Sequence, residues 1–311
     1  MKVFVTGVNG QLGHDVINEL AKRSIEAVGS DITESYQGIQ DGTAVCTASY
    51  EMLDITDEKK VQEVLNKVQP NAVIHCAAWT AVDLAEDEDK KEKVHLINAL
   101  GTEYLAKECR KLNAKMLYLS TDYVFDGNGT DPWHPDFEGY QPLNVYGKTK
   151  LEGELAVKRH LDQYFIVRIA WVFGLNGKNF IKTMLNLGKK YETLRVVCDQ
   201  IGTPTYTLDL SVLLVDMILS DKYGVYHATN EGGYISWYEF ACEIFKQAAD
   251  LMDDAYGKVN VLPVTTEEYG LSKAKRPFNS RLDKSKLSEQ GFTRLPDWKD
   301  ALTRYLKEVE L

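Results

Sequence analysis

The first half of the chain alternates short apolar runs with segments of helical spacing, and this rhythm constrains the fold more than any other feature. The runs are rich in β-branched residues and predict buried strands. Strands alternating with helices favour a parallel sheet that is covered on both faces and binds ligands beyond the carboxyl ends of its strands. The predicted strands are KVFVTG, IEAVGSD, NAVIHCAAW, KMLYLST and YFIVRIAWVFG, and the predicted helices are QLGHDVINELAKR, DEKKVQEVLNKVQP, VHLINALGTEYLAKECRKL and NVYGKTKLEGE.

Beyond residue 171 the rhythm loosens, and short segments such as GVYHATNEGG and VNVLPVT mix with helical ones such as SWYEFACEIFKQA. We therefore predict an α/β fold: a Rossmann-like, doubly wound parallel sheet over residues 1–170 and a smaller, mixed α/β C-terminal substrate domain over residues 171–311. The boundary is approximate because segments can interleave. No low-complexity linker separates the two parts, so we expect them to pack closely.

Composition excludes several classes of function. The 311 residues are 44% hydrophobic and carry a net charge of −10, which indicates a globular chain and argues against a nucleic-acid partner. No apolar run approaches the ~20 residues of a membrane span, and the start MKVFVTGVNGQLG lacks the features of a signal peptide. We expect a cytoplasmic protein without membrane contact. The five cysteines form no CxxC and the six histidines no HExxH, so we expect no metal site.

A glycine-rich turn follows the first predicted strand. The segment TGVNGQLG places Gly7, Gly10 and Gly13 between a strand and a helix. Glycines there permit a tight bend and let the backbone approach a pyrophosphate at the helix N-terminus. The spacing differs from GxGxxG, and the alternative is a plain strand–turn–helix junction. Asp31 ends the second strand and could accept hydrogen bonds from an adenosine ribose while repelling a 2′-phosphate, or could cap a turn.

Polar and small residues follow the other strands. Asp54 could face an adenine or cap the next helix, and Ala77 and Ala78 would let backbone pass close to a cofactor. Ser120 and Thr121 offer two hydroxyl groups at one strand end. Each of these residues could instead have a purely structural role, so the prediction of a binding site depends on the pattern as a whole.

Tyr146 and Lys150 lie four residues apart and share one face of a predicted helix, with Pro142 and Asn144 at its start. Such pairs also arise by chance, since Tyr269 and Lys273 form a second one, and the alternative is a surface pair with a solvated lysine. An ammonium ~4 Å from a phenol favours the phenolate by about 4 kcal/mol at an effective dielectric constant near 20. We therefore expect the pKa of Tyr146 to be lowered, by up to about two units.

These motifs together resemble the extended short-chain dehydrogenases/reductases, and within them the family of dTDP-4-dehydrorhamnose reductases. The segments that carry the resemblance occur in the family's order and span nearly the whole chain: GVNGQLG, AAWTAVDLAE, STDYVFDG, PLNVYGKTKLEGE, RIAWVFG, NFIKTML, DQIGTPT and RPFNSRLD. The resemblance implies reduction of the C4 ketone of dTDP-6-deoxy-L-lyxo-4-hexulose (dTDP-4-dehydrorhamnose) by NADPH or NADH, with dTDP-L-rhamnose as product.

The resemblance also implies roles for individual residues. Tyr146 would donate the proton, Lys150 would bind the nicotinamide ribose, and Thr121 would hydrogen-bond the reacting oxygen. The cofactor would contact Gly7, Asn9, Gly10, Gln11, Leu12, Gly13, Asp31, Asp54, Ile55, Ala77, Ala78, Thr80, Asn98, Tyr146 and Lys150. The nucleotide-sugar would contact Val82, Thr121, Tyr123, Trp171, Asn179, Arg276 and Asn279. For Trp171 a core position is the alternative, and for Arg276 a surface salt bridge.

Other readings stay open at this point. A relative of this fold is a non-catalytic regulatory subunit of an S-adenosylmethionine synthetase, and others are nucleotide-sugar epimerases or dehydratases. Dehydratases add an acidic pair beside the hydroxyl position, and here Thr121 is followed by Asp122 and then Tyr123. Some family members form metal-bridged dimers through acidic residues. Asp15 matches one such acid but Leu208 stands where another would align, so we expect no metal and either a monomer or a homodimer.

Overall fold

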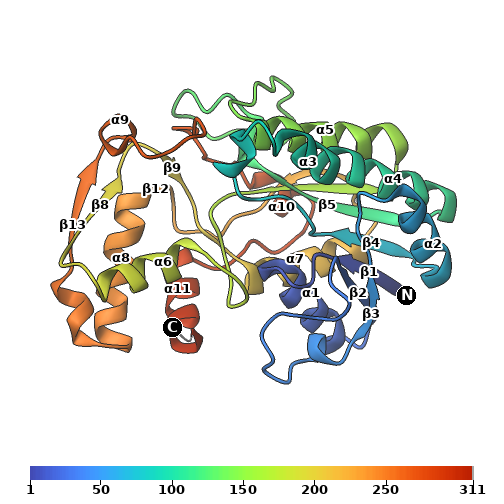
Figure 1. Cartoon of the computed structure of the whole chain (residues 1–311), viewed down its shortest axis with the longest axis horizontal. Coiled ribbons are helices and arrows are strands. Elements are labelled where there is room, and N and C mark those ends of the chain that lie inside the picture. The colour runs from blue at the N-terminus through green and yellow to red at the C-terminus, as the bar shows by residue number, and fades with distance from the viewer. Residues whose placement is uncertain (310–311) are drawn as a thin grey trace.

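A seven-stranded sheet forms the centre of the molecule, in a computed structural model that describes residues 1–309 (Figure 1). Every strand pair in it is parallel, which confirms the predicted doubly wound sheet. In spatial order the strands are β11 (Gly224–His227), β6 (Tyr164–Ile169), β5 (Lys115–Thr121), β4 (Ala72–His75), β1 (Lys2–Thr6), β2 (Glu26–Asp31) and β3 (Ser49–Met52).

Alternating side chains of the strands build a hydrophobic core on each face of the sheet. Val3 and Val5 of β1 pack into one core, while Phe4 between them packs into the other. This period of two explains why the strands read as continuous apolar runs, since both faces are buried. Helices α1 (Gln11–Lys22) and α7 (Thr207–Leu219) cover one face; the other is covered by α2 (Glu58–Val68), α4 (Gly101–Leu112) and α5 (Val145–His160).

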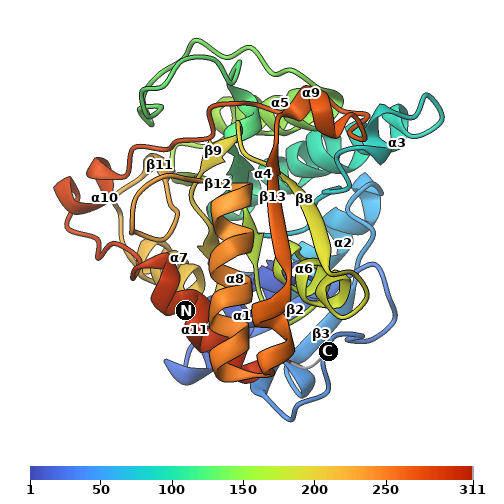
Figure 2. The ribbon, with the colours of Figure 1, turned by 90° about the vertical axis from the view of Figure 1, so that its left-hand side faces the viewer.

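A smaller mixed part lies at the other end of the molecule, where α8 and the β8–β13 pair face the viewer in Figure 2. Three two-stranded sheets and three longer helices make up this part, as the sequence predicted. The strands pair as β7 (Val172–Phe173) with β10 (Thr205–Tyr206), β9 (Ile201–Gly202) with β12 (Ile235–Ser236), and β8 (Thr193–Val197) with β13 (Asn260–Val264). The longer helices are α6 (Phe180–Gly188), α8 (Trp237–Leu251) and α11 (Trp298–Glu308), and the short helix α9 (Thr266–Tyr269) follows β13. Two other short helices, α3 (Lys91–His95) and α10 (Ser285–Glu289), lie elsewhere.

One strand lies outside the part to which the sequence assigned it. The segment Gly224–His227 was expected among the short elements of the C-terminal domain, but it pairs with β6 as the edge strand of the central sheet. Strand pairing between distant segments is not encoded locally, which is why the sequence did not show it. The chain thus crosses back into the first part after residue 171, and the proposed division at residue 170 stays a prediction.

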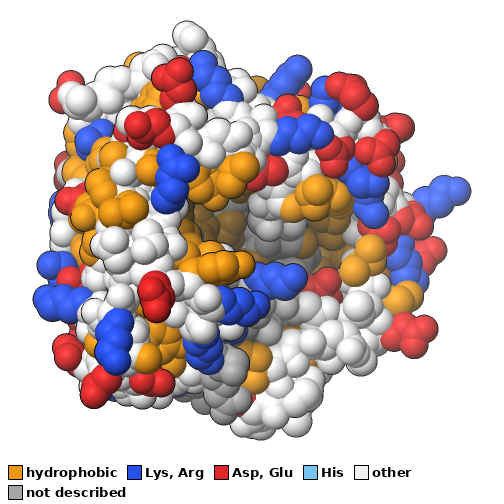
Figure 3. All heavy atoms as spheres, turned by 60° about the vertical axis from the view of Figure 1, so that its left-hand side comes forward, with side chains coloured by type: hydrophobic (Ala, Val, Ile, Leu, Met, Phe, Trp, Pro, Cys, Tyr) orange, Lys and Arg blue, Asp and Glu red, His pale blue; other side chains and the backbone are white. Residues whose placement is uncertain are grey.

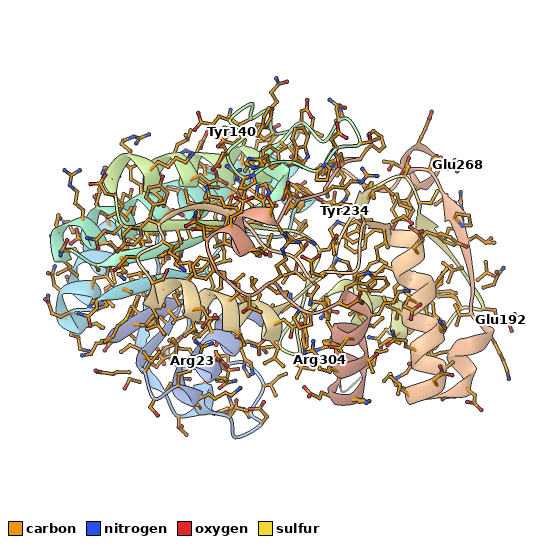
Figure 4. The ribbon with its side chains drawn as sticks, turned by 180° about the vertical axis from the view of Figure 1, so that it is seen from behind. Arg23, Tyr140, Glu192, Tyr234, Glu268 and Arg304 are labelled. Atoms are coloured by element: carbon orange, nitrogen blue, oxygen red, sulfur yellow. The ribbon has the colours of Figure 1, made fainter. Side chains whose placement is uncertain are left out.

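Helix α7 ties the two parts together through charged pairs at its ends. Arg23, which directly follows α1, donates to Asp216 (2.5 Å), and Arg304 from α11 donates to both carboxylate oxygens of Asp209 (2.8 Å each). Figure 4 labels Arg23, next to the end of α1, and Arg304, on α11, at separate places in the molecule. Among residues 1–309, no helix combines the length and the apolar character needed to cross a lipid bilayer.

Helix α5 buries a polar face against the sheet. Asn144 caps it by accepting the Gly147 N–H (2.8 Å), which confirms the predicted helix start. The buried face carries Lys150 and Glu154, whereas Leu155 is exposed. Glu154 and Arg168 of β6 are both fully buried and form a two-pronged ion pair (2.8 and 2.7 Å). The solvated-lysine alternative is therefore wrong, because Lys150 is only 3% exposed.

The buried ion pair predicts a large stability effect. Glu154→Gln removes the charge that compensates Arg168, and breaking one partner of a buried pair costs about 3–5 kcal/mol in free energy of unfolding. The exposed pair of Lys60 and Glu63 (3.3 Å) supplies the control, since Glu63→Gln should change stability by less than about 1 kcal/mol. Urea denaturation of both variants measures the difference. Equal stabilities for the two variants would contradict the role given to the buried pair.

Candidate functional site

A cavity of about 840 Å³ lies at the carboxyl ends of the central strands, where a doubly wound sheet binds its ligands. The face shown in Figure 3 is hollowed near its middle, with hydrophobic side chains and Lys and Arg side chains around the hollow. Most of the predicted site residues line the cavity: Gly7, Asn9, Gly10, Gln11, Leu12, Gly13, Asp31, Asp54, Ile55, Ala77, Ala78, Thr80, Val82, Thr121, Tyr123, Tyr146, Lys150 and Trp171.

The glycine turn leaves one wall of the cavity as bare backbone. Gly7 has a left-handed φ of 75°, and a Cβ atom on it would lie 2.6 Å from the Ala77 nitrogen. A Cβ atom on Gly13 would lie 2.3 Å from the Gly7 carbonyl oxygen. Gly10 caps α1 without any side-chain hydrogen bond, so the first N–H groups of the helix remain available. These features fit the diphosphate of a dinucleotide cofactor.

Two carboxylates, those of Asp31 and Asp54, also line the cavity. Asp31 accepts hydrogen bonds from the backbone N–H groups of Asn9 (3.0 Å) and Ile32 (2.8 Å), which fix its carboxylate at the cavity edge. Asp54 accepts from the backbone and the hydroxyl of Thr56 (2.9 and 2.7 Å). Both therefore hold turns in addition to lining the cavity. For Asp31 this is the predicted structural alternative, whereas the helix cap expected of Asp54 is supplied by Asp57, which accepts from the Lys60 N–H (3.0 Å). Their positions are compatible with a ribose that carries free hydroxyl groups.

Lys150 is buried in the floor of the cavity. Its ammonium lies over the ring of Tyr118, 4.1 Å from the centroid, and no described side chain or carbonyl accepts a hydrogen bond from it. Burial lowers the pKa of Lys150 to about 7, and the charges of Glu154 and Cys76 oppose that shift. A buried ammonium without an acceptor in residues 1–309 is a donor available to hydroxyl groups of a bound ligand.

The effect of the environment on Tyr146 differs from our expectation. Burial raises the pKa of the phenol, the nearby Asp122 charge also raises it, and a hydrogen bond with Thr121 opposes the rise. Lys150 is not among the groups that shift this pKa. The predicted lowering of the Tyr146 pKa is wrong for this structure because residue spacing does not report how deeply the phenol is buried. A raised pKa keeps Tyr146 protonated at neutral pH, which is the state that a proton donor needs.

Asp122 lines the cavity but is not among the site residues predicted from the sequence. It is 2% exposed, its Oδ1 accepts from the Thr121 hydroxyl (3.0 Å), and its Oδ2 has no partner within residues 1–309. Burial raises its pKa to about 6, and the nearby hydroxyl groups of Ser280 and Thr121 oppose the rise. Its place directly after Thr121 at a strand end was the available signal. The carboxylate orients the Thr121 hydroxyl beside Tyr146.

Two predicted site residues lie behind the cavity wall. The Asn98 amide accepts from the Trp79 N–H (2.8 Å) and donates to Thr149 (3.2 Å), so it holds the loop that follows β4. Asn179 caps α6 and donates to the side chain of Gln11 (3.1 Å). Each supports a neighbour of the cavity. Direct contact of either residue with a ligand stays a prediction.

Two further predicted residues support the substrate side of the cavity from behind. Arg276 donates to the Tyr123 hydroxyl (3.2 Å) and to Asp83 (2.7 Å), so it braces a lining residue. Asn279 is 1% exposed and donates to the Asp131 carbonyl (2.8 Å), which pins the loop after β5. The segment RPFNSRLD thus supports residues around the cavity without lining it. Its contact with a nucleotide stays a prediction.

Sequence reasoning also missed residues that come from the C-terminal half of the chain. Lys178 and Trp237 both line the cavity. Lys178 directly precedes the segment NFIKTML, which begins at Asn179, so its charge at that place was a usable signal. Trp237 begins α8, and nothing local indicated that this helix start would reach the site. Among residues 1–309, no three His, Cys, Asp or Glu side chains are grouped to hold a metal ion, and the expectation of no metal stays a prediction.

Comparison with known proteins finds similarity along the entire chain. A family model described as the RmlD substrate binding domain matches residues 1–311. The chain is 38% identical over 307 residues to the spore coat polysaccharide biosynthesis protein SpsK of Bacillus subtilis, covering 99% of this chain and 97% of that protein. It is 36% identical over 309 residues to a dTDP-4-dehydrorhamnose reductase of Aggregatibacter actinomycetemcomitans, covering 97% of each. A dTDP-4-dehydrorhamnose reductase of Bacillus anthracis, solved in complex with NADP, superposes with a TM-score of 0.86 at 39% identity, covering 99% of each chain.

The glycine turn allows a test with a matched control. Gly7 and Gly42 have nearly the same left-handed φ (75° and 77°), but a Cβ atom on Gly42 would meet nothing within 4 Å. Gly42→Ala should therefore cost only the backbone strain of about 1–2 kcal/mol. Gly7→Ala adds a clash with Ala77 and should weaken binding of NADH and NADPH at least tenfold, measured by fluorescence titration. An unchanged affinity in the folded Gly7→Ala protein would show that this turn does not hold the cofactor.

Proposed function

The chain belongs to the family of the RmlD substrate binding domain, and from that premise we propose that it is an NAD(P)H-dependent dTDP-4-dehydrorhamnose reductase. It reduces the C4 ketone of dTDP-6-deoxy-L-lyxo-4-hexulose and produces dTDP-L-rhamnose. The observation that carries the proposal is that a reductase of this name matches 97% of the chain at 36% identity, within a fold whose cavity brings Thr121, Tyr146 and Lys150 together. The names of the relatives favour this reading over a regulatory subunit or an epimerase.

The residues present in the cavity fit a reduced nicotinamide dinucleotide, NADPH or NADH. The bare backbone of Gly7, Gly10 and Gly13 would hold the diphosphate at the start of α1. Asp31 would accept hydrogen bonds from the adenosine ribose, and the Lys150 ammonium would donate to the nicotinamide ribose. When bound, the reduced nicotinamide supplies the hydride that the ketone carbon accepts.

The chain itself supplies the proton and its positioning. Tyr146 stays protonated until the ketone oxygen gains negative charge, and it then transfers the phenolic proton to that oxygen. The Thr121 hydroxyl donates to Asp122 (3.0 Å) and lines the cavity with Tyr146, so we expect it to orient the phenol and to hydrogen-bond the same ketone oxygen. A donor aimed at the charge that develops on the ketone oxygen stabilises the transition state more than the ground state.

The remaining expectations concern the protein as a whole. We propose that the substrate is a nucleotide-sugar held between the strand ends and the C-terminal part, with Val82, Tyr123 and Trp171 on its path. The assembly state of monomer or homodimer and the cytoplasmic location come from the sequence and stay predictions.

An activity assay tests the proposal directly. Purified protein mixed with dTDP-6-deoxy-L-lyxo-4-hexulose and NADH or NADPH should consume one reduced cofactor per ketosugar, with dTDP-L-rhamnose as product. Loss of absorbance at the reduced-nicotinamide band follows the reaction. Formation of an epimer without net use of cofactor would contradict the reductase assignment.

Removal of the phenol should stop the chemistry without unfolding the protein. Tyr146→Phe should lose ~10²–10⁴-fold in kcat, the usual range for an acid–base group. Lys150→Met should lose activity and also weaken cofactor binding, because one ammonium serves both roles. Tyr269, the other tyrosine followed by a lysine at the fourth position, is 37% exposed and gives the control. Tyr269→Phe should stay within a few-fold of the native rate, and a folded, fully active Tyr146→Phe would refute the catalytic role.

Asp31 should set the cofactor preference. Its carboxylate can accept hydrogen bonds from a free 2′-hydroxyl and repels a 2′-phosphate, so NADH should be accepted. Asp31→Ala should lower the ratio of kcat/KM for NADH to that for NADPH about tenfold, which corresponds to ~1.4 kcal/mol. Asp31→Asn, which keeps the shape and removes the charge, separates repulsion from hydrogen bonding. If both variants keep the native ratio of kcat/KM for NADH to that for NADPH, Asp31 does not determine the cofactor preference.

A further inference from the structure

Two tryptophans from distant parts of the chain stack on each other in the wall of the cavity. The rings of Trp171 and Trp237 have centroids 3.8 Å apart and planes 16° apart, and both residues line the cavity. Trp171 follows β6, while Trp237 is the first residue of α8. Both indoles are only partly buried, and among residues 1–309 neither N–H has a hydrogen-bond acceptor. The pair is thus a surface of the cavity rather than part of a closed core.

The backbone of Trp171 is held in a strained conformation. Its φ of 51° lies in the left-handed region, which is uncommon for a bulky residue and persists only where the surroundings impose it. Thr205 imposes it here, because its hydroxyl donates to the Ala170 carbonyl (2.6 Å) and its N–H donates to the Trp171 carbonyl (3.1 Å). This conformation turns the indole out of the line of β6.

Neighbouring segments also hold Trp237, the other member of the stack. Strand β12 pairs with β9, so that Ile235 lies opposite Gly202 and Trp237 follows two residues later. A Cβ atom on Gly202 would lie 2.9 Å from the Trp171 ring, so glycine makes room for the indole. Phe180 of α6 packs behind Trp237, with ring centroids 4.6 Å apart. Trp237 therefore packs between Phe180 and Trp171, and it covers one face of the Trp171 indole.

The stack lies beside the reacting group. Strands β5 and β6 pair with Thr121 opposite Ile169, and Trp171 is two residues beyond Ile169. The stack therefore lines the same cavity as Thr121 and Tyr146, beyond the neighbouring strand end, whereas the glycine turn and Asp31 follow other strands of the sheet. A molecule with its ketone at Tyr146 would place its sugar ring against these indoles.

We propose that Trp237 is a positioning residue for the sugar: by stacking on Trp171 it holds that indole as a rigid wall against which the 6-deoxysugar of the substrate packs. The inference rests on the proposed function and adds to it a residue from the C-terminal half. An aromatic wall suits a 6-deoxysugar because the methyl group needs no hydrogen-bond partner, whereas a buried hydroxyl group would.

Binding of two ligands that differ only by the sugar tests the role. The gain in affinity of dTDP-L-rhamnose over dTDP, measured by isothermal titration calorimetry, reports the sugar contacts alone. Trp237→Ala should reduce this gain about tenfold and raise the KM for the ketosugar by a similar factor. Its affinity for dTDP and for NADH should stay within threefold of the native protein, and its kcat within a few-fold.

Conservative and neighbouring variants control for damage to α8. Trp237→Phe keeps a stacking ring and should retain most of the gain in affinity of dTDP-L-rhamnose over dTDP (the sugar gain). Trp237→Leu gives a second truncation if thermal melting shows that Trp237→Ala is unstable. Tyr238→Ala removes the next aromatic side chain on the same helix, which does not line the cavity, and should leave the sugar gain unchanged.

The outcomes separate this inference from the function on which it rests. A native protein that reduces the ketosugar, together with a folded Trp237→Ala or Trp237→Leu variant that keeps the native sugar gain, would overturn the role of Trp237 and leave the function standing. Loss of NADH binding in Trp237→Ala to the same extent, or no rescue by Trp237→Phe, would also overturn it. A native protein that fails to reduce the ketosugar would refute the proposed function itself.

Discussion

The buried ion pair of Arg168 and Glu154 is the interaction on which the catalytic geometry depends. It joins β6 to α5, and its remaining hydrogen-bonding capacity is met by Ser120 on β5 (2.5 Å) and by Tyr140 (2.8 Å), whose side chain Figure 4 marks near the start of α5. A charged pair without solvent is stable only when its geometry and its hydrogen bonds are satisfied. This pair lets α5 turn a polar face toward the sheet. Tyr146 and Lys150 occupy the same face, about two turns and one turn before Glu154, respectively.

The cavity exists because the C-terminal half closes over the strand ends of the first. Asn176, in the loop after β7, donates to the carbonyls of Asn9 (2.9 Å) and Gly10 (3.3 Å), so this loop docks directly on the glycine turn. Nearby, Gln11 accepts from the Gly174 N–H (2.8 Å). Dinucleotide and sugar sites are therefore not separate modules. The residues that shape one are held in place by segments that shape the other.

Much of the sheet and of its strand-end motifs could be predicted from the sequence, because both depend on local patterns. Apolar periodicity marks the strands, and Gly7, Thr121 and Tyr146 follow or adjoin them at short range. The failures share a different cause. The place of β11, the direction of the Tyr146 pKa shift and the stacking of Trp237 on Trp171 all arise from contacts between segments far apart in the chain. Burial and long-range pairing decide them, and no local spacing reports either.

The central claim is that Tyr146 protonates a ketone at the carbon that receives a hydride from a reduced nicotinamide. The most direct test uses NADH and NADPH deuterated on the nicotinamide C4, mixed with the native protein and dTDP-6-deoxy-L-lyxo-4-hexulose. Nuclear magnetic resonance of the product locates the label. The account predicts one deuterium at C4 of dTDP-L-rhamnose for each cofactor oxidised. A product without deuterium at C4, or a changed sugar without oxidised cofactor, would contradict it.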